Sequence, residues 1–125
     1  MVAVSESISA VKQRPDTRGV PGYLDFSVSV MAMDGVATVR ITGDLDCYTA
    51  PQLRAELLAL VDQGTRHVTL DVGGTQFMDS TGLSTLVGGL KRFRENGGNM
   101  VLKAPTPAAL KLFEITGLHT VFDIA

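Results

Sequence analysis

The segment Phe77-Met78-Asp79-Ser80-Thr81-Gly82-Leu83 joins two different sequence patterns. Residues 67–72 precede it and are rich in β-branched and apolar residues, which is typical of a strand. After it, apolar residues recur at helical spacing, at Leu83, Leu86, Val87, Leu90 and Phe93. Ser80 is therefore expected at or just before the first turn of a helix, where its hydroxyl can cap the helix or accept a phosphate.

The composition describes an ordinary globular chain. It has 125 residues, 45% of them hydrophobic, which is enough to bury one core without disulfides or a metal. A formal charge of -2 gives no basic surface of the kind that binds nucleic acid or an anionic membrane. Cys47 is the only cysteine, in keeping with a reducing cytoplasm. Neither a signal peptide nor an apolar run of roughly 18 residues is present, so we expect a soluble cytoplasmic protein.

Residues 1–22 mix charged residues, serine and proline with few large apolar residues, and this composition predicts a disordered N-terminal tail. A short helix over residues 5–12 is the one element expected within it. A single folded domain should then occupy residues 23–125. It begins with a β-hairpin, because apolar residues alternate on both sides of the turn sequence Asp34-Gly35, at Phe26, Val28, Val30, Ala37, Val39 and Ile41.

A polar loop, Gly43-Asp44-Leu45-Asp46, follows the hairpin and leads into a helix. Thr49 and Gln52 have the spacing of a capping box, Pro51 falls in the first turn, and Gly64 ends the helix. The remaining expected elements are a strand at residues 67–72, a helix at about 80–96, a strand at 100–102, a helix from Thr106-Pro107 to Gly117, and a short strand at 121–122.

The order of these elements predicts an α/β fold. Helices between strands imply crossovers between parallel strands, whereas the hairpin adds antiparallel pairing. We therefore expect one mixed sheet of four to five strands, with helices packed mainly on one face.

Several segments besides Asp79-Ser80-Thr81-Gly82 are informative. They are Thr49-Ala50 after the polar loop, Gly97-Gly98-Asn99-Met100-Val101-Leu102, and Leu112-Phe113-Glu114-Ile115-Thr116-Gly117-Leu118. With the order of elements, these segments resemble the STAS domain of bacterial anti-sigma factor antagonists, and the resemblance covers about residues 26–125. Family members often continue into a further helix, so we expect that helix to be absent or removed after Ala125.

The resemblance implies a function in sigma factor regulation, as part of a stress response. In this family the serine directly after the aspartate, which corresponds to Ser80, is phosphorylated by a partner that is both anti-sigma factor and kinase. The unphosphorylated antagonist binds the anti-sigma factor and frees sigma, and the phosphorylated form does not. A supporting aspartate of the family corresponds to Asp46. The implied partners are this kinase, which uses ATP and Mg²⁺, and a serine phosphatase. The chain itself is expected to be a monomer or weak dimer without a cofactor.

The expected partner-binding surface surrounds Ser80. With the apolar residues of its helix facing inward, Ser84, Thr85, Gly88 and Gly89 should lie toward the outside or the flank, where small residues let another protein approach the backbone. Gly88 and Gly89 are equally compatible with internal packing against a neighbouring element. The residues expected to bind the partner are Asp46, Asp79, Ser80, Thr81, Gly82, Leu83, Ser84 and Gly88.

Ordinary structural roles compete with these assignments. Ser80 could simply cap the helix, and Asp79 could either cap it or orient the serine hydroxyl. Asp46 could be a turn residue that bonds its own backbone. Cys47 could be sensitive to oxidation, although a lone cysteine is more often inert. The two histidines, His67 and His119, have no partners at metal-ligand spacing, which predicts no metal site.

Two other classes of function compete with the antagonist. A serine at a strand-to-helix turn is also found in hydrolases, but Met78 replaces the first glycine of G-x-S-x-G and only His119 follows as a candidate base. Gly73-Gly74 ahead of Ser80 lacks the lysine of a phosphate-binding P-loop. We therefore expect no enzymatic activity. The closer alternative is a module of the same fold in a stressosome-like scaffold or a lipid-transport complex.

Overall fold

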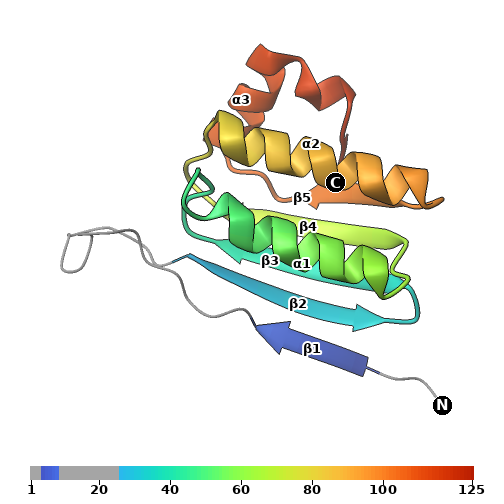
Figure 1. The fold of residues 1–125 in the computed structure, drawn as a ribbon. Coiled ribbons are helices and arrows are strands. Elements are labelled where there is room, and N and C mark those ends of the chain that lie inside the picture. The colour runs from blue at the N-terminus through green and yellow to red at the C-terminus, as the bar shows by residue number, and fades with distance from the viewer. Residues whose placement is uncertain (1–3, 9–25) are drawn as a thin grey trace.

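The computed structural model describes residues 4–8 and 26–125. Its elements are β1 (Val4–Ile8), β2 (Ser27–Met33), β3 (Val36–Thr42), α1 (Ala50–Asp62), β4 (His67–Gly74), α2 (Ser80–Glu95), β5 (Asn99–Lys103), α3 (Pro107–Thr116), the 3-10 helix η1 (Leu118–Thr120) and β6 (Asp123–Ile124). The strands form one sheet in the order β1-β2-β3-β4-β5-β6 (Figure 1). β1, β2 and β3 are antiparallel neighbours, whereas β3 to β6 run parallel. The predicted α/β fold with a mixed sheet is confirmed.

A two-residue turn closes the β2–β3 hairpin, as the sequence predicted. Met33 pairs with Val36, and the residues between them, Asp34 and Gly35, have φ values of 52° and 80°. Positive φ at both central residues is the mark of a type I′ turn, whose twist matches that of the two strands. Aspartate tolerates this conformation and glycine adopts it freely, so the local sequence selects the turn.

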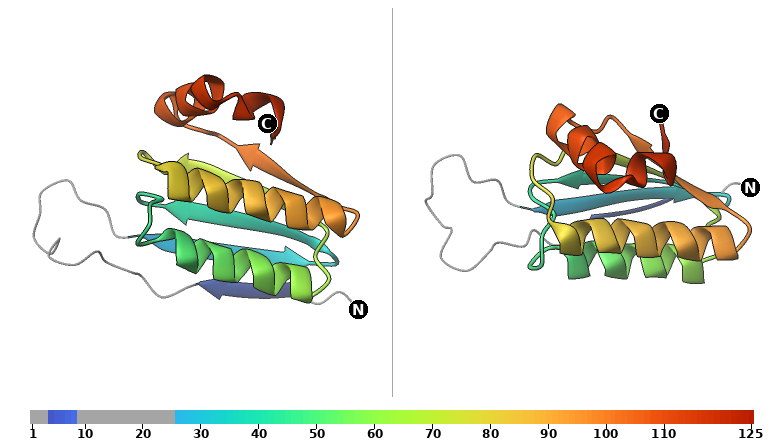
Figure 2. Two further views of the ribbon diagram at one scale, coloured as in Figure 1. Left: turned by 45° about the horizontal axis from the view of Figure 1, so that its top comes forward. Right: turned by 90° about the horizontal axis from the view of Figure 1, so that it is seen from above.

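The core lies between one face of the sheet and the helices α1 and α2. Alternate residues of the central strands point to this face and are fully buried, among them Val39, Leu70 and Leu102. The two helices lie side by side across it (Figures 1 and 2), and they bury Leu53, Leu57, Leu60, Leu86, Leu90 and Phe93. Burying one such side chain stabilises the fold by about 1.5–3 kcal/mol. The apolar spacing noted in the sequence is therefore the contact face of these helices.

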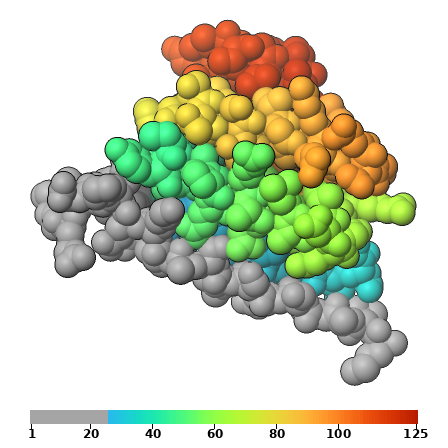
Figure 3. Space-filling view, in the orientation of Figure 1, coloured from blue at the N-terminus to red at the C-terminus, as the bar shows by residue number. Residues whose placement is uncertain are grey.

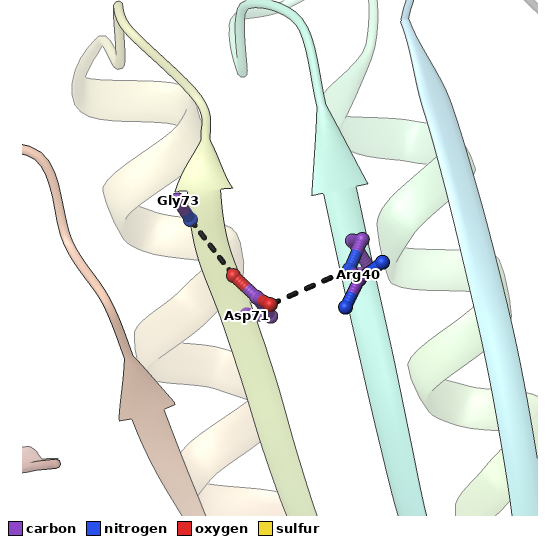
Figure 4. Close-up of polar contacts among 3 residues, drawn as sticks. All are labelled: Arg40, Asp71 and Gly73. Carbon is purple, nitrogen blue, oxygen red and sulfur yellow. Dashed lines mark hydrogen bonds and ion pairs between the residues drawn. The ribbon is translucent and has the colours of Figure 1, made fainter.

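The opposite face of the sheet carries polar side chains at its centre. Arg40 of β3 lies beside Asp71 of β4, with 3.4 Å between Arg40 Nε and Asp71 Oδ2 (Figure 4). Asp71 Oδ1 also accepts a hydrogen bond from the Gly73 amide at 3.0 Å. Because the Arg40 side chain is 67% exposed, water screens the pair, and its contribution is below about 1 kcal/mol.

The third helix lies beyond α2, at the β5–β6 end of the sheet (Figure 2). Thr106 caps it, because its hydroxyl oxygen accepts a hydrogen bond from the Ala109 amide at 3.2 Å. Gly117 ends it with a φ of 76°. The predicted bounds of α3 are therefore confirmed.

The chain after α3 differs from the predicted strand at residues 121–122. η1 follows α3 directly, and β6 begins only at Asp123. Phe122 is buried and packs against Phe113, with 5.7 Å between the ring centroids. The apolar character that indicated a strand at Phe122 instead reflects this contact with α3.

The N-terminal prediction needs a correction. Val4–Ile8 is a strand that pairs antiparallel with β2, from Val4 opposite Met33 to Ile8 opposite Ser29. The helix expected over residues 5–12 is wrong for residues 5–8, and the sheet has more strands than the four to five expected. β2 would otherwise present unpaired backbone groups along its edge, and a five-residue strand satisfies them whatever its side chains. The remainder of the predicted tail lies outside the described residues.

The ends of α1 and α2 follow the glycine pattern of the sequence. α1 ends at Asp62 before Gly64, and α2 ends at Glu95 before Gly97, and both glycines have positive φ. α2 has 16 residues. Within residues 4–8 and 26–125, none of the helices has the length and apolar character that crossing a bilayer requires.

Candidate functional site

Two loops meet at the carboxyl ends of β3 and β4. Because these strands are parallel, the segments that leave them start at the same edge of the sheet. Backbone hydrogen bonds join the two segments: the Leu45 amide donates to Phe77 O at 2.9 Å, and the Asp79 amide donates to Leu45 O at 3.2 Å. Leu45 and Met78 also form an isolated parallel bridge, and both side chains are buried. The start of α2 is thus fixed against the loop that follows β3.

Asp79 is the residue that caps α2. Its backbone is extended, and its Oδ1 accepts a hydrogen bond from the Gly82 amide at 2.9 Å. Ser80 is therefore the first residue inside the helix and not its cap, which decides between the two capping alternatives. The Ser80 side chain is exposed and makes no hydrogen bond to any described residue. Its hydroxyl is free to react.

Gly82 fits a space that admits no side chain. A Cβ atom at this position would lie 2.5 Å from Leu45 O, which is far inside van der Waals contact. The Gly82 amide is also the donor to the Asp79 cap. The Asp79-Ser80-Thr81-Gly82 block thus has a division of tasks: the first and last residues build the helix start, and the two middle residues are exposed.

Asp46 stabilises its own loop. Its Oδ1 accepts hydrogen bonds from the Tyr48 amide at 2.9 Å and the Thr49 amide at 3.2 Å, and the residue is only 6% exposed. The Thr49 hydroxyl accepts a hydrogen bond from the Asp46 amide at 2.9 Å and lies 2.7 Å from Asp44 O, to which it donates. The turn interpretation of Asp46 describes these contacts. The predicted capping box is wrong, because the Thr49 side chain bonds the loop and makes no cap bond to α1.

The residues expected to bind a partner fall into two sets. Asp46, Gly82 and Leu83 are buried and form the support of the site. Of the others, Asp79 is half-buried and the rest are exposed around the start and outer face of α2, namely Ser80, Thr81, Ser84 and Gly88. A surface that another protein can touch is therefore made by the second set.

The two glycines of α2 have different surroundings. A Cβ atom on Gly88 would have nothing within 4 Å, whereas one on Gly89 would lie 2.9 Å from Leu57 Cδ1 of α1. Gly89 therefore allows close packing between α1 and α2. Gly88 faces open space, and because it has no side chain, the helix backbone is accessible there. Internal packing is therefore the role of Gly89, and an interface role for Gly88 stays a prediction.

Two exposed aromatic residues at this edge were missed by the sequence analysis. Tyr48 is 53% exposed and Phe77 is 54% exposed, and they lie on the two loops that are joined through Leu45. Aromatic side chains are enriched at protein interfaces and often dominate their energetics. Phe77 was quoted only as part of the segment before the helix, because a single aromatic residue in a short loop does not reveal whether it is buried or exposed. Tyr48 offered a signal, since it is a large aromatic residue within a polar loop.

Ser80 has no histidine positioned to activate it. His67 begins β4, so it lies at the opposite end of that strand from Ser80. His119 lies in η1 ahead of the parallel strand β6, also at that opposite edge, where its Nδ1 is 3.3 Å from Phe113 O. A serine nucleophile of the hydrolase type needs a base within hydrogen-bond reach. Among the residues that the structure describes, no cluster of three or more potential metal ligands is found either.

The sequence profile of the STAS domain family matches residues 27–125. The anti-sigma-B factor antagonist of Bacillus subtilis (strain 168) is 34% identical over 102 residues, which cover 82% of this chain and 93% of that protein. The anti-sigma-B factor antagonist of Staphylococcus epidermidis is 31% identical over 101 residues, covering 81% and 94%. The chain therefore belongs to the STAS domain family, among relatives that are anti-sigma factor antagonists.

Solved structures of such antagonists have the same fold. An anti-sigma factor antagonist from Mycobacterium paratuberculosis superposes with a TM-score of 0.71 at 27% identity, over 79% of this chain and 84% of that one. The Bacillus cell fate determinant SpoIIAA in its phosphorylated form gives a TM-score of 0.63 at 26% identity, over 80% and 90%. SpoIIAA in its unphosphorylated form gives 0.69 at 24% identity, over 78% and 87%, which is a likeness of fold.

Proposed function

We propose that this chain is an anti-sigma factor antagonist switched by phosphorylation of Ser80. In the unphosphorylated state it binds an anti-sigma factor that is also a serine kinase, and the sigma factor is released. Phosphate on Ser80 abolishes this binding. The observation that carries the proposal is the exposed, unbonded Ser80 hydroxyl at the first position of α2, beside a cap that Asp79 already provides.

The start of α2 is suited to carry a phosphate. A phosphoserine adds roughly -1.5 to -2 charges and three acceptor oxygens at neutral pH. The amides of Ser80 and Thr81 precede the first intrahelical bonds, and no described group accepts a hydrogen bond from them. The positive end of the helix dipole favours an anion at the same place. The domain should therefore remain folded when Ser80 is phosphorylated.

A complex formed over the same spot would not tolerate the phosphate. A partner that covers Ser80 removes water from the dianion, and this desolvation costs several kcal/mol unless the partner supplies a cation. Asp79 adds a negative charge on the neighbouring residue. Since about 1.4 kcal/mol corresponds to a tenfold change in affinity, we expect binding to weaken by two or more orders of magnitude.

The relatives support this mechanism. The Bacillus subtilis and Staphylococcus proteins are named for antagonism of an anti-sigma-B factor, and the identity to them extends over most of both chains. SpoIIAA has been solved both with and without phosphate. These facts concern those proteins, and they support the same switch here because the Ser80 site is intact.

The remaining parts of the proposal concern the setting. The kinase partner supplies ATP and Mg²⁺, so this chain needs no cofactor of its own, and a serine phosphatase restores the unphosphorylated form. The chain acts in the cytoplasm, as a monomer or weak dimer, without contacting nucleic acid or membrane. It has a regulatory role and no catalytic one, in line with the family to which it belongs.

The direct test is a phosphorylation assay. The purified chain is mixed with each candidate anti-sigma kinase of its organism and with ATP and Mg²⁺, and the modified residues are located by mass spectrometry. We expect phosphate on Ser80 alone, although Thr81 is exposed next to it. Phosphate found only on Thr81 or only on serines of residues 1–22 would remove the basis of the proposal.

A further inference from the structure

A groove separates α1 from α2 on the outer surface of the molecule. Its volume is about 450 Å³, and its walls are formed by residues 54–61 of α1 and 84–95 of α2. The two helices are adjacent on the face of the molecule that Figure 3 shows. Leu57 and Gly89, which pack against each other, lie at its base, and Gly88 leaves one wall open.

The rim of this groove is positively charged. Arg54, Lys91 and Arg92 line it and are exposed, against a single carboxylate from Glu95. None of the three cations forms an ion pair with a residue that the structure describes. The whole chain carries a formal charge of -2, so the groove has the opposite sign to the molecule. An unneutralised cationic rim around an apolar base attracts a ligand that is acidic outside and apolar inside.

The groove continues the surface around Ser80. Ser84 and Thr85, which line its near end, lie about one helical turn beyond Ser80 on α2. The other wall is lined by α1 residues between Arg54 and Val61, and at 1.5 Å per residue this stretch of helix spans about 11 Å. A partner that covers Ser80 and extends along α2 therefore enters a groove with room for about two turns of helix.

We propose that this groove binds an acidic amphipathic helix of the anti-sigma factor. Apolar side chains of that helix pack on the half-buried Leu58 and Val61, and its carboxylates face Arg54 and Lys91. The inference rests on the proposed function, since it names the segment of the partner that the same surface recognises. This is the helix-in-groove mode of recognition. An acidic helix that ends near Ser80 also explains why phosphorylation would weaken binding, because the phosphate would then lie close to negative charges of the partner.

The test measures affinity for the anti-sigma kinase identified by the phosphorylation assay. By calorimetry, the double variant Arg54→Glu/Lys91→Glu should bind at least about tenfold more weakly than the wild type. The matched control is Arg66→Glu/Lys111→Glu, which reverses two exposed cations outside the groove. This control should bind within about twofold of the wild type. If it loses as much affinity as the groove variant, overall charge is responsible and the groove inference is wrong.

A neutral variant tests shape without charge. Gly88→Leu places a side chain into the groove, and the space around a Gly88 Cβ lets the domain fold, which circular dichroism verifies. It should weaken binding about tenfold at low salt and at 0.5 M salt, whereas the effect of charge reversal should shrink as salt screens it. Unchanged binding of Gly88→Leu overturns the groove as a docking surface, even if charge reversal weakens binding.

The two proposals fail in different ways. If both groove variants bind normally while Ser80→Glu binds weakly, the switch stands and the groove inference is wrong. If Ser80→Glu also binds as tightly as the wild type, the proposed function itself is wrong.

Discussion

The proposed role of Ser80 as phosphate acceptor depends on the structural roles of its neighbours. Asp79 caps the helix, Gly82 admits the Leu45 backbone, and the serine side chain makes no hydrogen bond to any described residue. A side chain without a structural contact can change its chemistry at little cost to stability. The residues that stabilise the helix start, Asp79 and Gly82, are therefore different from the residue proposed to be modified, Ser80, although they are close in sequence.

Substitutions of Ser80 separate charge from shape. Ser80→Ala keeps the site small and neutral, so it should bind the anti-sigma factor like the wild type and act as a constitutive antagonist. Ser80→Glu adds a charge that the partner must desolvate, and we expect at least about tenfold weaker binding with the fold intact. Calorimetry gives the affinities, and circular dichroism checks the fold. Equal binding by the two variants would contradict an electrostatic switch.

Replacing the cap should affect stability where replacing the serine does not. Asp79→Ala removes the acceptor of the Gly82 amide and should lower the free energy of unfolding by about 0.5–2 kcal/mol. Ser80→Ala is the matched control, and it should change stability by less than about 0.5 kcal/mol. Urea denaturation measures both. A larger loss for Ser80→Ala than for Asp79→Ala would return the capping role to the serine.

At the scale of elements, the start of α2 and the loop after β3 form one unit. Backbone hydrogen bonds through Leu45 join them, and Asp46 and Thr49 hold the turn of the loop. A shift of the loop therefore moves the first turn of α2, and with it the position of Ser80. The buried residues of the candidate site, such as Asp46 and Gly82, therefore fix the position of Ser80 without contacting a partner themselves.

Two glycine substitutions in α2 should change the free energy of unfolding in opposite directions. Gly82→Ala forces a Cβ atom against Leu45 O, and we expect a loss of about 1–3 kcal/mol in the free energy of unfolding. Gly88→Ala meets nothing within 4 Å and gains helix propensity, so it should stabilise the chain by up to about 1 kcal/mol. Thermal and urea unfolding test both. A neutral Gly82→Ala would show that the loop adapts easily.

The spacing of apolar residues and the positions of turn residues made most of the elements predictable from the sequence. The Asp34-Gly35 turn and the glycines after α1 and α2 lie where they were expected, because their backbone conformations are set locally. The predicted capping box at Thr49 was wrong because the Thr49 hydroxyl accepts a hydrogen bond from the Asp46 amide in the loop and none from an amide of α1. The strand at Val4–Ile8 was missed because its pairing depends on the edge of β2. Long-range contacts of this kind leave little trace in local sequence.

On the scale of the whole molecule, the site and the first strand lie in different parts of the sheet. β1 lies at the edge beyond β2, whereas Ser80 begins the helix between β4 and β5 (Figure 1). The family match starts at residue 27 and includes the Ser80 site. The surface that binds the anti-sigma factor is therefore expected to lie after residue 25.

Removal of residues 1–22 tests this separation. Each backbone hydrogen bond lost between β1 and β2 contributes about 0.5–1.5 kcal/mol net, so we expect the free energy of unfolding to fall by a few kcal/mol while the rest of the sheet stays folded. Affinity for the anti-sigma factor should stay within about twofold, because the Ser80 surface is unchanged. Denaturation and calorimetry on the truncated chain give both quantities. A tenfold loss of affinity would place part of the binding surface in this segment.

The joint between the two loops has an evolutionary consequence, because it is made by main-chain atoms. Exchanging Cys47, Tyr48 or Phe77, which are all exposed, alters what a partner meets and leaves the bonds through Leu45 in place. After gene duplication, one copy can acquire a new partner through a few such exchanges while it retains Ser80 and the cap beside it. Separate signalling pathways can thus arise from one scaffold without cross-reaction, since the frame is shared and the recognition residues are not.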